Sequence, residues 1–164
     1  MAELTNLEEK LAEVTGLAMA AEAAGGKVTK LTAKKDSDLA ATLEQMANEA
    51  AETTERCTVV AGTFEGKKTA ILDEAREVKK KASSMMSTYL DSNADALDGF
   101  EFLTMAEAAE VGHWSVLQTL NEQAGNSELR GLIEWALPIQ ERHFQNVLAG
   151  SVKLAGDEDP NEPA

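Results

Sequence analysis

The stretch Glu110–His143, EVGHWSVLQTLNEQAGNSELRGLIEWALPIQERH, decides the fold class. On both sides of Gly125 its apolar residues recur at alternating steps of three and four, which is the pattern of an amphipathic helix. Glycine favours the conformation that ends many helices, and Asn126 or Ser127 can cap the helix that follows. The stretch therefore predicts two long helices that are joined by a short turn and packed antiparallel.

Polar residues interrupt the apolar seams of these two helices at the same depth. With the turn centred on residues 125–127, antiparallel pairing sets Glu110 against His143 and His113 against Gln140. Burying these groups costs several kcal/mol unless they pair or bind something. We therefore expect either a bound metal ion or a self-satisfied layer, made of a Glu110–His143 ion pair and a His113–Gln140 hydrogen bond.

The spacing of the four polar residues is compatible with a metal site. Glu110 and His113 stand at positions i and i+3, which directs a carboxylate and an imidazole toward one point, as in di-iron carboxylate bundles. Gln140 and His143 repeat the spacing, but with an uncharged amide in place of the carboxylate. Carboxylate and imidazole ligands suit manganese, iron or zinc. The residues alone leave the metal site and the self-satisfied layer as equal alternatives.

The rest of the chain carries three further helical patterns. One covers residues 5–35 and opens with a capping box of Thr5 and Glu8. A second begins near residue 36 or 37 and continues to residue 64, and a third runs over residues 67–89 as a helical connection. Turn-forming residues follow, with Gly99 as the last of them. We expect an all-α fold, an antiparallel four-helix bundle with an additional connecting helix.

Composition excludes several classes of protein. The 164 residues include 29 acidic and 15 basic side chains, a formal charge of −14, which argues against binding to nucleic acid or to an anionic membrane face. No segment approaches the ~20 apolar residues of a membrane span. The single cysteine, Cys57, excludes an internal disulfide and fits the stripe as a small buried residue. We expect a cytoplasmic protein with one domain, residues 1–155, and a disordered acidic tail, residues 156–164.

Two motifs carry a resemblance to a known family. The segments Glu-Ala-Ala-Glu-Val-Gly-His-Trp-Ser-Val-Leu, from Glu107, and Leu-Ile-Glu-Trp-Ala-Leu-Pro-Ile-Gln-Glu-Arg-His, which ends at His143, resemble the C-terminal helix pair of the ferritin-like superfamily. The resemblance is closest to small bacterial stress-linked ferritin-like proteins, whose two hairpins are joined by a helical connection. It implies that the protein binds iron or manganese, either as one ion or as a dinuclear site. It also implies redox or oxygen chemistry of an oxidase-like kind in stress protection, and self-association as a dimer.

The resemblance also implies ligands from the first hairpin. The superfamily supplies a Glu and a Glu-x-x-His there, and the nearest match is Glu49-Ala-Ala-Glu52, with Glu22 at about the level of Glu49. The implied metal ligands thus come from both hairpins. They are Glu110, His113, His143 and Gln140, with Glu49, Glu52 and Glu22. No histidine follows Glu49, and this departure, with the Gln140 amide, favours the alternative of a metal-free ferritin-like bundle that acts as a non-catalytic binding or structural module.

Three smaller predictions concern Glu107, Pro138 and the alanine-rich stripes. Glu107 is either a further ligand or, with Thr104, part of a capping box that starts the helix. Pro138 removes one backbone N–H inside the last helix and predicts a kink about one turn before His143. The alanine-rich stripes leave a third functional class, a module that binds a small apolar ligand or a partner helix.

Overall fold

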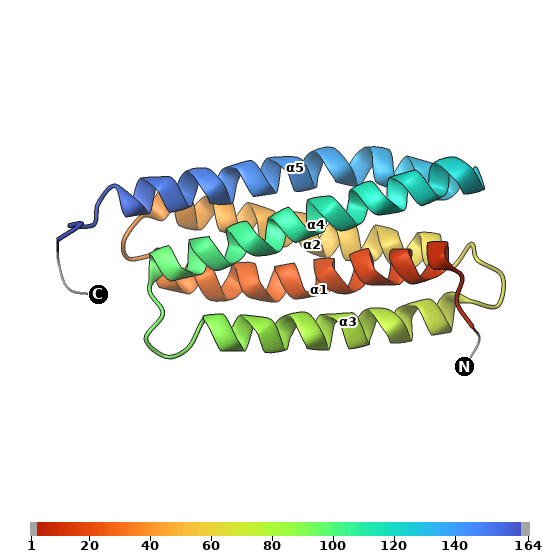
Figure 1. Ribbon diagram of the computed structural model, residues 1–164, viewed down its shortest axis with the longest axis horizontal. Helices are drawn as coiled ribbons and strands as arrows, with labels where there is room; N and C mark the ends of the chain where they lie inside the picture. The colour runs from red at the N-terminus through yellow and green to blue at the C-terminus, as the bar shows by residue number, and fades with distance from the viewer. Residues whose placement is uncertain (1–2, 162–164) are drawn as a thin grey trace.

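The computed structural model describes residues 3–161 and contains no β-strand within them. Consecutive helices run in opposite directions and lie side by side along one long axis (Figure 1). The prediction of an all-α fold is confirmed. The five helices are α1 (Asn6–Thr32), α2 (Ser37–Ala61), α3 (Lys68–Tyr89), α4 (Ala96–Ala124) and α5 (Ser127–Ala155).

Local capping explains where the helices begin. Thr5 and Glu8 form the predicted capping box at the start of α1, each side chain bonding to the backbone N–H of the other. The helix α2 begins where the sequence predicts, and the Asp36 carboxylate caps it, since it accepts hydrogen bonds from two N–H groups of the first turn. A second capping box, of Asp95 and Asp98, starts α4. These contacts satisfy backbone donors that no helical carbonyl can reach.

The fourth helix is longer than the sequence indicated. Gly99, predicted as the end of a break, lies within α4, and the predicted capping box of Thr104 and Glu107 is wrong because the helix is already one turn or more under way. The Thr104 hydroxyl instead donates to the Phe100 carbonyl, 2.8 Å away. A small residue is needed at position 99, because a Cβ atom there would lie 2.7 Å from Cγ1 of Val28 on α1.

The turn between α4 and α5 is the one that the sequence predicts. Gly125 has a left-handed backbone with φ of +70° and ends α4, and its N–H donates to the Asn121 carbonyl. The Asn126 side chain then accepts from the Leu129 N–H and caps α5. The last helix continues through Pro138 without interruption as far as Ala155.

The helix α3 lies on the outside of the assembly, against α1 (Figure 1). Its buried residues, Ile71 and Ala75, both belong to its first half. Gly16 of α1 makes this approach possible, because a Cβ atom at that position would collide with the Ala75 carbonyl oxygen. In the second half, Met85 remains exposed. The helix is therefore anchored at one end and covers α1 only loosely at the other.

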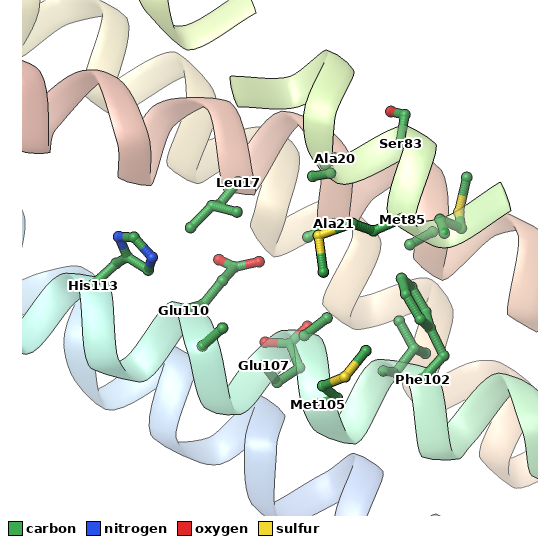
Figure 2. A pocket seen from close by; sticks show the side chains of 16 residues that line it. Leu17, Ala20, Ala21, Ser83, Met85, Phe102, Met105, Glu107, Glu110 and His113 are labelled. Atoms are coloured by element: carbon green, nitrogen blue, oxygen red, sulfur yellow. The ribbon is translucent and has the colours of Figure 1, made fainter. Parts of the chain in front are cut away.

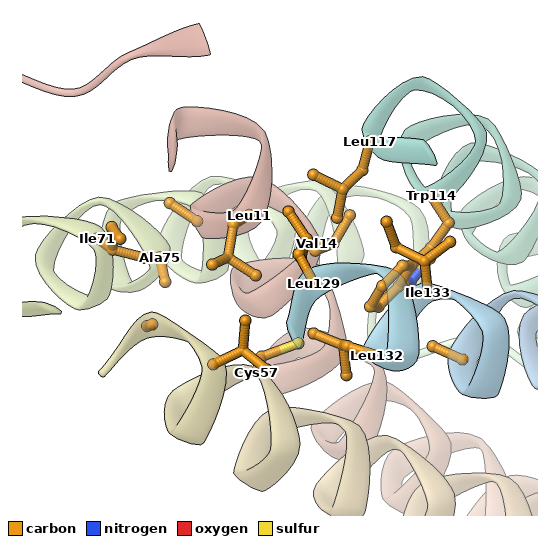
Figure 3. Close-up of a cluster of buried hydrophobic side chains, with 14 residues drawn as sticks. Leu11, Val14, Cys57, Ile71, Ala75, Trp114, Leu117, Leu129, Leu132 and Ile133 are labelled. Carbon is orange, nitrogen blue, oxygen red and sulfur yellow. The ribbon is translucent and has the colours of Figure 1, made fainter. Parts of the chain in front are cut away.

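Two apolar clusters fill different halves of the assembly. The first includes Trp114, Leu117 and Ile133 (Figure 3), and the second includes Phe100 and Val147. Along α1, α2, α4 and α5 the first cluster occupies one half of each helix and the second cluster the other half. Most of the buried polar residues, including Glu107, Glu110, Gln140 and His143, are found in the stretches between the clusters, whereas Glu8, Thr32 and Asn121 lie nearer to helix ends.

The C-terminal residues 156–161 are exposed and hold few contacts. The Gly156 N–H continues the helical bonding by donating to the Val152 carbonyl, and Glu158 pairs with Lys35 at 2.8 Å. Residues 162–164 of the predicted disordered tail lie outside the described residues. Among the helices of the described part, none is long and apolar enough to cross a membrane.

Candidate functional site

A layer of five polar side chains separates the two apolar clusters. Four of them are almost completely buried, with exposed fractions of 3% for Glu107, 2% for Glu110, and 1% each for Gln140 and His143. The spacing of three residues puts the members of each pair on one face of its helix, α4 or α5. Glu49 joins them from α2 through a hydrogen bond to His143. We call these five residues the polar layer.

His143 lies between two carboxylates of the polar layer. Its Nε2 donates to Oε2 of Glu49 at 2.6 Å, and its Nδ1 is 3.7 Å from Oε2 of Glu107. Burial by itself lowers the pKa of His143, but the negative charges of Glu107 and Glu49 outweigh it and raise the pKa above its usual value of 6.5. The imidazole therefore keeps its positive charge to higher pH than a free imidazole does.

Glu49 accepts more hydrogen bonds than any other member of the polar layer. Its Oε1 accepts from Arg142 at 2.6 Å and from Gln45 at 3.1 Å, while its Oε2 accepts from His143. Burial works to raise the pKa of Glu49, but these three donors, led by His143, lower it below its usual value. Glu49 is thus an ionised carboxylate whose oxygens are both occupied, and it fixes the orientation of the His143 ring.

The remaining members of the polar layer have oxygens without a donor. Oε2 of Glu107, Oε2 of Glu110 and Oε1 of Gln140 are buried and accept no hydrogen bond from any described residue. Burial raises the pKa of Glu110 well above its usual value, and the charge of Glu107 raises it further. Glu110 therefore holds its proton to higher pH than an exposed carboxyl group does. Three buried acceptor atoms in one layer are therefore available to a positively charged partner.

The structure corrects the predicted pairing of α4 with α5. His113 does not meet Gln140; its Nδ1 bonds to Oε2 of Glu13 on α1 at 2.9 Å, and its side chain is 38% exposed. The predicted Glu110–His143 ion pair is also wrong, because the ion pairs of His143 are with Glu49 and with Glu107 of α4. The α4 carboxylate next to His143 is thus Glu107, which lies one helical turn before the expected Glu110. The flank of α4 that carries His113 faces α1 instead.

Two candidates of the first hairpin lie outside the polar layer. Glu52 is exposed and forms an ion pair with Arg56, one turn further along α2, at 2.7 Å. Glu22 is exposed on α1 and lines a surface depression with Lys27 and Lys79. Of the three carboxylates expected from the first hairpin, only Glu49 contributes.

The sequence alone did not decide whether Glu107 is a ligand or part of a capping box. Its position three residues before Glu110 indicates that Glu107 belongs to the polar layer, because this spacing places both carboxylates on one helix face. Thr104, three residues earlier, offered a capping box as an equally good explanation, and the continuous α4 removes that explanation. Glu107 then has no local role at its position, and its 3% exposure shows that it points inward.

The donor atoms of the polar layer suit a first-row metal in chemical type. One imidazole, two carboxylates with open oxygens and one amide oxygen are ligands that manganese and iron accept. In their present rotamers, however, no three His, Cys, Asp or Glu side chains within residues 3–161 converge on a point that could hold a metal ion. Ligation would require Glu107 or Glu110 to turn about its side-chain bonds.

Comparison of the chain with protein-family models, with curated proteins and with solved structures gives no match. The ferritin-like resemblance therefore stays a prediction, carried by the two motifs and by the order of the helices.

Proposed function

We propose that this chain is a ferritin-like four-helix bundle, formed by α1, α2, α4 and α5 with α3 as the additional helix, that binds one iron or manganese ion in the polar layer. The observation that supports this proposal is the set of three buried oxygens without a donor, on Glu107, Glu110 and Gln140. A buried acceptor without a partner costs about 1–3 kcal/mol. A single cation would satisfy all three.

Charge supports a cation in preference to a neutral donor. In the absence of a cation, Glu110 takes up a proton because burial and Glu107 disfavour its ionised form. A metal ion would replace that proton and neutralise both carboxylates, so binding is expected to release protons.

The contact between Glu49 and His143 supports His143 as a ligand. Metal-binding histidines usually donate their second ring N–H to a carboxylate or carbonyl, which fixes the ring. Glu49 accepts from Nε2, so Nδ1 is the atom left toward Glu107, and it would bind the ion after losing its own proton. The proposed ligands are Glu107, Glu110, Gln140 and His143, with Glu49 as a positioning residue. His113, Glu52 and Glu22 lie apart from this set.

A bound iron or manganese ion would supply the redox or oxygen chemistry that the resemblance implies. The residues of this chain would do three things around it. Glu110 would release a proton and take it back when the ion leaves, Glu49 would hold the His143 ring in place, and His143 would bind through Nδ1 after losing the proton there. Stress protection and self-association as a dimer are further parts of the proposal.

A specific observation favours a second candidate, a metal-free binding or structural module. The His143 cation already lies between Glu49 and Glu107, and a protonated Glu110 leaves little unbalanced charge. A buried polar layer of this kind can fix the register of helices without any ligand. In that case the layer would serve the fold alone.

Titration with manganese separates the two candidates. The protein is purified without an affinity tag, treated with a chelator, and titrated with Mn(II) while the resonance of free Mn(II) is followed by electron paramagnetic resonance. We expect one ion per chain, at least about tenfold weaker binding in Glu107→Gln and His143→Gln, and unchanged binding in the exposed control Glu52→Gln. Absence of binding, or equal binding by all four proteins, would overturn the metal proposal in favour of the metal-free module.

A further inference from the structure

A cavity of about 270 Å³ lies between α1, α3 and α4, beside the polar layer (Figure 2). Apart from Ser83 and three titratable residues of α4, its walls are apolar. It is larger than an engineered cavity of about 150 Å³ that accepts benzene. The walls include Leu17, Ala21, Met85, Met86, Phe102 and Met105.

The sequence explains why a space is left here. Apart from Leu17, α1 lines the cavity with small side chains, Ala20, Ala21 and Ala24, and α4 adds Ala106. Larger residues at these positions would fill the gap between the helices. The nearby end of α3 is not buried against α1, since both buried residues of α3 lie in its first half. The cavity is thus a consequence of alanine-rich stripes under a loosely attached helix.

Two carboxyl groups form the polar end of this cavity. Glu107 and Glu110 both line it, and Figure 2 shows the Glu110 carboxyl directed from α4 toward Leu17 of α1. Oε2 of each carboxyl group accepts no hydrogen bond from any described residue, and Oε2 of Glu107 has the His143 Nδ1, 3.7 Å away, as an ion-pair partner. Both side chains are more than nine-tenths buried. An apolar space with unpartnered acceptors at one end is suited to an apolar molecule with one strong donor.

We propose that this cavity binds a small apolar amine, with its ammonium group against Glu107 and Glu110 and its hydrocarbon part against the alanine and methionine side chains. The proposal does not rest on metal binding. It draws on the same two carboxyl groups, so the amine and a metal ion are expected to exclude each other.

The charge at the polar end of the cavity indicates which head group the ligand carries. An ammonium group offers three donors and a positive charge, which match two acceptors and a buried negative charge. An alcohol offers one donor without charge, and a carboxylate would be repelled by Glu107. The tail can vary, because methionine side chains are flexible and adapt to different shapes. Met85 and Met105, at 53% and 40% exposure, stand where a ligand could enter.

Methyl resonances of methionine report on this cavity directly. The chelator-treated full chain, labelled with ¹³C at its methionine methyl groups, is titrated with hexylamine, hexanol or hexanoate at neutral pH. We expect hexylamine to shift the methyl signals of Met85, Met86 and Met105 saturably, at least about tenfold more tightly than hexanol, with no effect of hexanoate. The methyl groups of Met19 and Met46, which do not line the cavity, should stay unshifted.

Two variants and one control test whether hexylamine binds in this cavity through Glu107. Glu107→Gln should weaken hexylamine binding at least about tenfold, and Ala21→Leu should fill the cavity and abolish it, whereas Glu52→Gln should change nothing. Binding of hexanol or hexanoate as tight as hexylamine, an unchanged affinity in Glu107→Gln, or no shift at all would overturn the proposal. Because Mn(II) is tested separately, hexylamine binding without Mn(II) binding would contradict only the metal function, and the reverse would contradict only the amine.

Discussion

Nε2 of His143 on α5 donates to Oε2 of Glu49 on α2 at 2.6 Å, although 94 residues separate them in the sequence. The bond joins the first helical pair to the last pair at the level of the polar layer. His143 is buried there, and Arg142 bonds to the same carboxylate from the outer side. Glu49 thus links a buried cation to an exposed one, and it holds the ring in one orientation.

The raised pKa of His143 predicts that stability falls with increasing pH. In the unfolded chain His143 loses its proton around pH 6.5, whereas the folded protein keeps it to higher pH. The stabilisation is therefore complete below pH 6.5 and is lost as the pH rises through the folded pKa. Glu110 acts in the same direction, because its folded pKa is also raised. Urea unfolding between pH 6 and pH 9 should show a decreasing free energy of unfolding.

The control for this pH dependence is His143→Gln, which should be less stable at pH 6 and should show a flatter profile. Glu49 does not counteract the trend, since its lowered pKa affects stability only when the pH falls below its usual value of 4.5. A wild-type stability that is constant or rises across the range would contradict the assignment of His143 as a cation between two carboxylates.

Replacement of Glu110 by glutamine should stabilise the metal-free protein at neutral pH. The raised pKa of Glu110 means that its ionisation is less favourable in the folded chain than in the unfolded chain, so the carboxyl group opposes folding above pH 4.5. An amide of the same shape removes this effect, and we expect a gain on the order of 1 kcal/mol in urea unfolding at pH 7. A loss of 1 kcal/mol or more, measured the same way, would show that Glu110 is ionised and paired in the fold.

A methyl group at Gly150 should destabilise the protein. Gly150 lies inside α5, and a Cβ atom there would collide with the buried ring of Phe100. We expect Gly150→Ala to lower the free energy of unfolding by about 1–3 kcal/mol, as overpacking of a core does. Gly131 of the same helix is the matched control, because a Cβ atom there meets nothing within 4 Å. Gly131→Ala should raise stability by about 0.5–1 kcal/mol through helix propensity.

Cys57 should be unreactive in the folded protein. Its side chain is fully buried, and burial raises the pKa of its thiol to about 12, so almost no thiolate forms at neutral pH. A chromogenic disulfide reagent should react about 100-fold or more slowly with the folded chain than with the chain unfolded in urea. Rapid reaction of the folded protein would place Cys57 at the surface and contradict its position in the first apolar cluster.

The sequence predicted the helices well because their ends depend on neighbouring residues. Asp36 caps α2 by bonding to N–H groups two and three residues away, and the Gly125 turn needs only a left-handed backbone. Such contacts can be read from a short window of sequence. Gly99 misled the prediction because the property that matters there is its contact with Val28 on another helix.

The composition of the polar layer could be predicted only in part for the same reason. Gln140 and His143 were found because they interrupt an apolar seam on their own helix. His113 interrupts a seam in the same way, yet it bonds to Glu13, which is 100 residues away. Glu49 lies beside its stripe and not in it, and only the packing of α2 on α5 gives it a role. The rotation of a helix about its axis is set by such distant contacts.

Infrared difference spectroscopy of the carboxyl groups tests the cation-binding layer most directly. The metal-free protein at neutral pH should show the band of a protonated carboxyl group, which saturating Mn(II) should remove and which Glu110→Gln should lack from the start. A spectrum without that band in the metal-free protein, or a band that persists at saturating Mn(II), would contradict the proposal that Glu110 exchanges its proton for a metal ion.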